Sequence, residues 1–332
     1  MPLTRRLAAA LLAAAATVLA GCAAETAPTE TPAGAAPAAD AYPVTIEHRF
    51  GSATIPAAPQ RVVSLGYTEQ DAILAFGVVP VGVRYAFGPQ DDVFFPWADQ
   101  AAGGAQPTIL PREAVDPEAV AALRPDLIMA ITAGLEQNEY DVLSRIAPVV
   151  VPPKDYVDFG VPWQVQTRVT GQALGQTARA DELVRQVEAR FAEVKAANPG
   201  LVGKTLALSG PSSDGQYPFH ATDDTRTRFF GELGMVVPPE LDAVAGDRFY
   251  GYLSREQASM LDQDVLVLQS GSAEERAAIE ADPILAAVPV VAEGRSLFIE
   301  GADYDALQFA SALSLPYLLD GFVPELRAVA GA

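Results

Sequence analysis

The longest amphipathic pattern in the chain lies between Trp163 and Asn198, near the middle of the sequence. In its second part, apolar residues recur at helical spacing on one face: Ala180, Leu183, Val184, Val187, Phe191 and Val194. Thr177 is a suitable N-cap, and Asn198-Pro199-Gly200 ends the pattern. The spacing predicts a helix of about 20 residues, roughly 30 Å long. Such a helix either packs inside one domain or connects two, and the flanking sequence decides between these.

Short apolar segments alternate with helical patterns before this helix. An alternating stretch at 42–55 predicts a β-hairpin. Strand-like segments follow at 61–65, 79–83, 126–131 and 149–151. Helical patterns at 68–76, from Asp116, and at 140–146 separate them. Apolar strands that alternate with helices predict a parallel sheet covered on both faces.

The same order returns after the helix. Strands are expected at 204–209, 265–268 and 297–299, with a helix at 223–233. Ser254 and Gln257 occupy the positions of a capping box. A closing helix is expected over 306–319, kinked or shortened by Pro316.

A local sequence repeat supports this symmetry. The matching pairs, each separated by 138 positions, are Glu118 and Glu256, Leu123 and Leu261, and Asp126 and Asp264. Two copies of a long repeat are typical of duplicated lobes. We therefore interpret the chain as α/β, with two Rossmann-like lobes that carry parallel-type sheets and are joined by one long helix. The expected boundaries are 42–174 for the first lobe, 175–199 for the interdomain helix and 200–332 for the second lobe.

The N-terminus has the pattern of an export signal. Arg5 and Arg6 precede an apolar run that ends shortly before Cys22. Leu19-Ala20-Gly21-Cys22 resembles the bacterial lipobox, in which the Cys receives a diacylglycerol. We expect a signal peptide at 1–21 and an Ala-, Pro- and Thr-rich disordered tether at 22–41. The mature protein is then extracytoplasmic and anchored to the cell membrane by lipid on Cys22.

Composition excludes several classes of function. The 42 acidic residues against 22 basic ones give a net charge of −20, which makes nucleic acid and anionic membrane surfaces poor partners. With one Cys and two His, the chain lacks the ligand clusters of Zn, Mn or Cu sites, so no protein-bound metal or cofactor is expected. It also lacks the GxSxG, HExxH, P-loop and GxGxxG motifs, so catalytic residues are not expected. A cell-envelope hydrolase remains the alternative from another class.

Several segments carry a resemblance to a known family. They are PQRVVSLGYTEQDAILAFGVVPVGV at 59–83, DPEAVAALRPDLIM at 116–129, YDVLSRIAPVV at 140–150 and LSREQASMLDQDVLVL at 253–268. The chain resembles the substrate-binding proteins of bacterial ABC importers whose two lobes are joined by a single helix, the class III periplasmic-binding-protein fold. RTRFFGELG at 226–234 is most similar to the iron–siderophore branch.

The resemblance implies a monomer that captures a ferric siderophore between its lobes. It delivers the ligand to a permease driven by a cytoplasmic ATPase. Haem and cobalamin are alternative ligands within the same class. In this family one Glu on each lobe docks onto Arg residues of the permease, and those positions match Glu118 and Glu256.

Loop residues after the expected strands predict the ligand site, because ligands of open α/β sheets gather beyond the carboxyl ends of the strands. Arg forks suit the oxygens of an iron complex, and aromatic rings suit its organic shell. The predicted ligand-binding residues are Tyr67, Arg84, Tyr85, Trp97, Arg226, Arg248, Tyr250 and Tyr304. His220 and Tyr304 are alternative direct iron ligands. Trp163 is expected to be structural.

Overall fold

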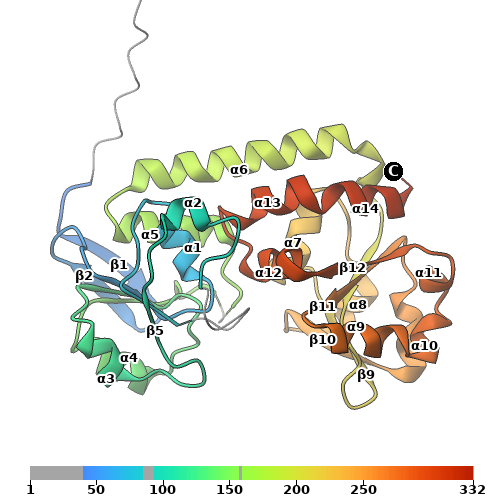
Figure 1. Cartoon of the computed structure of the whole chain (residues 1–332), viewed down its shortest axis with the longest axis horizontal. Helices are drawn as coiled ribbons and strands as arrows, with labels where there is room; N and C mark the ends of the chain where they lie inside the picture. The colour runs from blue at the N-terminus through green and yellow to red at the C-terminus, as the bar shows by residue number, and fades with distance from the viewer. Residues whose placement is uncertain (1–39, 85–92, 157–158, 332) are drawn as a thin grey trace, which may run out of the picture. The chain divides into compact units, whose positions relative to one another are not determined.

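The computed structural model describes residues 40–84, 93–156 and 159–331 (Figure 1). The predicted signal peptide, Cys22, nearly all of the predicted tether and Tyr85 lie outside these ranges. Across the described ranges, no helix combines the length and the apolar character required to cross a membrane.

The first half contains a hairpin and a five-stranded parallel sheet. The hairpin pairs β1 (Val44–His48) with β2 (Gly51–Ile55), as predicted. The sheet has the order β5-β4-β3-β6-β7. Its strands are β3 (Val62–Ser64), β4 (Gly82–Val83), β5 (Thr108–Ile109), β6 (Leu127–Met129) and β7 (Val149–Val150). Its helices are α1 (Glu69–Leu74), α2 (Asp99–Ala102), α3 (Pro117–Ala122) and α4 (Gln137–Leu143). β3 and β6 are buried throughout, which explains their continuous apolar sequence.

The second half contains a separate five-stranded sheet with the order β10-β9-β8-β11-β12. Its strands are β8 (Leu206–Ser209), β9 (Gln216–His220), β10 (Tyr250–Ser254), β11 (Val265–Ser270) and β12 (Ser296–Glu300). β9 runs antiparallel to both β8 and β10, so the sheet is mixed. The predicted parallel pairing holds for β8, β11 and β12 but is wrong for β9. Only residues 210–215 connect β8 to β9, and a parallel connection needs a dozen residues or more.

The helical segments of the second half surround this mixed sheet. They are η1 (Pro199–Leu201), α7 (Thr225–Glu232), α8 (Pro239–Ala245), η2 (Arg255–Leu261), α9 (Ala273–Glu280), α10 (Pro283–Ala286), α11 (Pro289–Ala292), α12 (Gly301–Phe309), α13 (Ser314–Gly321) and α14 (Val323–Ala330). The Ser254 N–H donates to Gln257 Oε1 at 3.0 Å, so the predicted capping interaction forms. The segment that it opens is a 3₁₀ helix.

The expected closing helix is two helices. α12 ends before Ala310, which adopts φ 43°, and the Ser311 hydroxyl oxygen accepts the N–H groups of Leu313 and Ser314. The interruption therefore precedes Pro316. That proline lies in the first turn of α13, where no helical partner requires its missing N–H.

The central helix α6 (Thr177–Ala197) follows α5 (Trp163–Ala173) and packs against α5 and α13 (Figure 1). All the positions predicted for its apolar face are buried. Ala180 and Leu183 belong to the core of the first half. The core of the second half contains the other four apolar residues of this face, Val184, Val187, Phe191 and Val194. One face of α6 therefore belongs to both cores. The domain boundaries at 175 and 199 stay predictions.

The repeated Asp residues have equivalent positions. Asp126 accepts the backbone N–H groups of Gln60 and Arg61, both at 2.8 Å, just before β3. Asp264 accepts the Thr205 N–H at 2.8 Å, just before β8. Each carboxylate therefore fixes the start of the central strand of its own sheet.

Candidate ligand-binding cleft

A cavity of about 270 Å³ is lined by residues from both halves of the chain. The first half and α5 contribute Tyr67, Thr68, Thr132, Phe159, Val161, Trp163 and Gln166. The second half contributes Thr225, Arg226, Phe249, Gln308, Phe309 and Ala310. Tyr67 and Thr132 follow the carboxyl ends of β3 and β6, where the sequence predicted the site.

Tyr67 forms part of an aromatic wall that Arg84 supports from behind. The Tyr67 ring stacks on Phe159 with centroids 5.6 Å apart. The guanidinium of Arg84 lies 4.8 Å from the Tyr67 centroid, and its Nη2 donates to the Tyr67 hydroxyl at 3.2 Å. Arg84 is 4% exposed and also donates to the carbonyls of Leu65 and Ala133. Arg84 therefore orients Tyr67, and among the described residues it is not part of the cavity lining.

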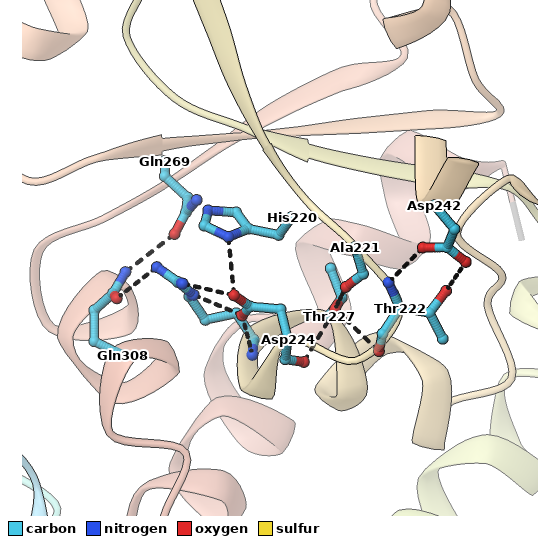
Figure 2. Close-up of polar contacts among 9 residues, drawn as sticks. His220, Ala221, Thr222, Asp224, Thr227, Asp242, Gln269 and Gln308 are labelled. Carbon is cyan, nitrogen blue, oxygen red and sulfur yellow. Dashed lines mark hydrogen bonds and ion pairs between the residues drawn. The ribbon is translucent and has the colours of Figure 1, made fainter. Parts of the chain in front are cut away.

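Arg226 reaches the cavity from the first turn of α7, where a buried carboxylate holds it. Its Nε and Nη2 donate to Asp224 Oδ1 and Oδ2, both at 2.7 Å. Its Nη1 donates to Gln308 Oε1 at 3.2 Å, and Gln308 Nε2 donates in turn to Gln269 at 3.0 Å. Figure 2 shows the contact between Asp224 and His220 and the one between Gln308 and Gln269. The guanidinium is thus fixed by charged and amide partners.

Burial and neighbouring charges determine the protonation states of Asp224 and His220. Burial raises the pKa of Asp224, but the hydrogen bonds from His220 and Arg226 outweigh it and hold that pKa far below its usual range. Burial, followed by the charge of Arg226, lowers the pKa of His220. His220 Nδ1 lies 3.1 Å from Asp224 Oδ2, so the neutral ring donates there. Asp224 is therefore a carboxylate at neutral pH, and His220 is uncharged.

The loop that carries Asp224 is itself anchored. Asp242 accepts the Thr222 N–H at 2.8 Å and the Thr222 hydroxyl at 2.7 Å (Figure 2). The Thr227 hydroxyl donates to the carbonyl of Ala221. These bonds fix the connection between β9 and α7, and with it the position of Arg226.

Trp97 lies behind the cavity wall and links the two halves. Its ring stacks on Phe95 at 4.8 Å and meets the edge of Phe309 at 5.5 Å. Its Nε1 donates to Asp71 Oδ2 at 2.7 Å, and the Ser311 hydroxyl donates to the same oxygen at 2.7 Å. Burial raises the pKa of Asp71 to about 7, although the bonds from Ser311 and Trp97 oppose the shift. Trp97 therefore supports Phe309.

A second cavity of about 510 Å³ adjoins the first at Phe249, which lines both. Arg248 lines this second space, and its guanidinium lies 5.7 Å from the Tyr250 centroid. Tyr250 packs between Phe249 and Tyr252, at 5.0 and 5.8 Å. The predicted pair Arg248 and Tyr250 therefore lies toward the second cavity.

The proposed direct iron ligands are not brought together at the first cavity. Tyr304 packs beside Gly271, and burial, followed by the charge of Glu275, raises its pKa. His220 uses Nδ1 for Asp224 and is 9% exposed. Neither lines the first cavity as described. Among the described residues, no group of three or more His, Cys, Asp or Glu is placed to hold a metal ion.

Sequence reasoning did not select several lining residues. Phe159, Gln308 and Phe309 had no motif of their own, and the last two were expected inside a longer helix. Trp163 was expected to be structural. It does pack in the core and donates to Glu232 at 3.0 Å, but it also lines the cavity. The helix break at Ala310, which exposes the end of α12 to the cavity, is seen only in the structure, and no residue type marks it in the sequence.

Glu118 and Glu256 occupy equivalent exposed positions. Each is the second residue of its helix, Glu118 in α3 and Glu256 in η2. Both carboxylates lie in the first turn of a helix, where the helix dipole alone already favours a negative charge. Their docking role stays a prediction.

The profile of the periplasmic binding protein family matches residues 64–300. The chain belongs to this family. The predicted family and fold are therefore confirmed. A solved structure of a periplasmic solute binding protein from Mycobacterium smegmatis superimposes on this binding protein with a TM-score of 0.79 and 38% identity, covering 87% of this chain and 99% of that one.

Two curated relatives have iron-related names. The Fe(3+) dicitrate-binding periplasmic protein of Escherichia coli is 27% identical over 60% of this chain and 63% of its own length. A probable siderophore-binding lipoprotein of Bacillus subtilis is 27% identical over 67% of each chain. This binding protein thus spans about two thirds of the length of these two relatives.

Proposed function

We propose that this protein captures a ferric siderophore in the cleft and delivers it to an ABC permease driven by a cytoplasmic ATPase. The observation that carries the proposal is the cavity lined from both halves by aromatic rings, hydroxyls, amides and Arg226. A bulky complex of iron and an organic chelator fits such a lining, because rings cover its apolar parts and the polar groups orient it. The names of the relatives support iron complexes as the class of ligand.

The protein acts by binding and not by catalysis. Its family consists of binding proteins that work outside the cytoplasm. The lipobox-like Leu19-Ala20-Gly21-Cys22 and the word lipoprotein in the name of the B. subtilis relative support a lipid anchor on Cys22. The monomer is then held at the outer face of the cell membrane.

Ligand binding is accompanied by a modest closure. The ligand contacts both halves, whereas α6 buries one face in the cores of both. Sliding or bending α6 would expose core residues such as Val184 and Phe191, each exposed by 3% or less. The central helix therefore limits the amplitude of any hinge motion.

Tryptophan fluorescence tests the proposal. Trp163 lines the cavity and Trp97 contacts Phe309, so a bound ferric complex is expected to quench both. Titration with ferric hydroxamates, ferric catecholates, ferric citrate, haem and cobalamin should give saturable quenching with at least one ferric chelate. Trp163→Phe should reduce the quenching amplitude while calorimetric affinity changes little. Saturable binding of haem or cobalamin alone would overturn the siderophore assignment.

Tyr67→Ala is expected to weaken binding of the preferred ferric complex by about 10-fold, because an aromatic side chain of the cavity lining is removed. Tyr252→Ala is the matched control, since Tyr252 is 42% exposed and outside the first cavity as described. Isothermal titration calorimetry measures both. Equal affinities of the two variants would contradict a role for Tyr67 in the cleft.

A further inference from the structure

Arg226 is the single charged side chain among the described residues that line the first cavity. The other polar lining groups are neutral: Thr68, Thr132, Gln166, Thr225 and Gln308. The charge that a ligand meets therefore depends on the environment of one guanidinium.

The positive charge of Arg226 is already compensated. Asp224 binds its Nε and Nη2 in a two-pronged ion pair, both at 2.7 Å, and the Asp224 side chain is 1% exposed. Nη1 is directed to Gln308. His220, the third group on this carboxylate, is neutral. Arg226 retains N–H groups for hydrogen bonds, but the Arg226–Asp224 pair has no net charge.

The second predicted cation of this region does not reach the cavity. Arg84 is 4% exposed, and its guanidinium donates to the carbonyls of Leu65, Ala133 and Arg112 and to the Tyr67 hydroxyl. Backbone oxygens thus stabilise its charge behind the aromatic wall. A ligand in the cavity would therefore contact the Tyr67 ring and not the Arg84 guanidinium.

The adjoining cavity adds negative charge. Its lining includes two cations, Arg228 and Arg248, and four acids, Asp155, Asp223, Asp242 and Asp247. Arg228 is itself paired with Asp223 at 3.7 Å. Residues 85–92 and 157–158, which are outside the described ranges, contain no Lys or Arg. The described lining of the two cavities therefore has no surplus of positive charge to offset an anionic ligand.

We propose that the cleft selects neutral or cationic ferric hydroxamates over anionic ferric catecholates and ferric citrates. This inference rests on the proposed function and names the ligand class of the same site. A catecholate complex that enters the cleft loses its hydration without gaining an uncompensated cation. A neutral hydroxamate complex needs only hydrogen bonds to its carbonyl oxygens and apolar contacts to its chain, and the lining supplies both.

Four probes of different charge test the selection: ferrichrome as a neutral hydroxamate, ferrioxamine B as a cationic one, a ferric tris-catecholate and ferric dicitrate. Calorimetry at about 0.15 M salt is expected to give at least about 30-fold tighter binding of one or both hydroxamates. Raising the salt concentration should change ferrichrome affinity little. Anionic complexes that bind as tightly as the hydroxamates would overturn the inference and leave the proposed function standing. Binding of none of the four would overturn both.

Asp224→Asn gives a sharper test, because Asn retains the N-cap of α7 and removes the compensating charge. The affinity for the tris-catecholate and for ferric dicitrate is expected to rise about 10-fold relative to the affinity for ferrichrome. Asp320→Asn, which makes the same charge change at the surface pair with Arg190, is the control and should leave all four affinities unchanged. Unchanged affinity for the anions relative to ferrichrome in folded Asp224→Asn would contradict the inference. If that variant does not fold, the wild-type comparison and its salt dependence decide.

Discussion

Iron uptake is expected to fall at least about 100-fold when Glu118 and Glu256 are both replaced by Lys, whereas the affinity for the ligand stays within about twofold. Each Glu is exposed in the first turn of its helix, at equivalent positions of the two halves. If each meets an Arg of the permease, Lys converts two attractions into two repulsions. Uptake of radioactive iron by cells that lack the wild-type protein measures the first quantity, and calorimetry measures the second.

The matched control changes Glu240 and Glu325 to Lys. These residues are also exposed, and each lies in the first turn of its helix, in α8 and α14. The control therefore makes the same change in net charge and removes the same helix-dipole interaction. It should retain uptake. Equal losses of iron uptake in both double variants would show a general charge effect. A loss of ligand affinity in the Glu118 and Glu256 variant would contradict a docking role.

Asp71→Asn is expected to raise the free energy of unfolding by up to about 4 kcal/mol at about pH 8 and to leave it unchanged at about pH 4. Burial raises the pKa of Asp71 to about 7, against an ordinary value of 3.8. The folded protein therefore holds this proton more tightly than the unfolded chain does. The stability that Asp71 contributes is complete below about pH 4 and is lost as the pH rises through about 7.

The structure explains why Asn removes this penalty. Asp71 Oδ2 accepts bonds from Trp97 and Ser311, and the Asn carbonyl oxygen accepts the same two. Asp71 Oδ1 is buried without a hydrogen-bond partner among the described residues, so the ionised form is poorly compensated.

Urea unfolding from about pH 4 to about pH 8 measures the difference in the free energy of unfolding between variant and wild type. Asp99→Asn is the control, because Asp99 is an exposed Asp in the same half of the chain. Its difference from wild type should be small and independent of pH. A pH-independent difference for Asp71→Asn as well would contradict the assignment of a neutral carboxyl to the folded state.

Local pattern alone determined the central helix and the repeat. The buried face of α6 follows from the periodicity of its own residues, because a helix places positions three and four apart on one side. Asp126 and Asp264 could likewise be paired by spacing, and both bind the backbone just before a central strand. The mixed second sheet was missed, although the short connection at 210–215 carried the information.

The binding residues show where sequence reasoning ends. Residue type and loop position predicted Tyr67 and Arg226, and both line the cavity. They also predicted Arg84 and Trp97, which contact lining residues from behind and do not line the cavity as described. Tyr304 packs beside Gly271, Arg248 and Tyr250 lie toward the second cavity, and Tyr85 is outside the described residues.

The sequence by itself determined the α/β class, the joining helix and the loops that approach the cleft, because propensity and periodicity act between near neighbours. The tertiary structure decided which side chains line the cavity and what charge they present there. Arg84 turns inward because its carbonyl partners come from Leu65 and Ala133, on other strand ends. Arg226 is neutralised because a buried Asp224 and the distant Gln308 meet it in space. The carbonyls of Leu65 and Ala133 and the Gln308 side chain come from segments far apart in the chain, and no local pattern encodes their approach. Asp224 lies only two residues before Arg226, but its burial is decided by the fold.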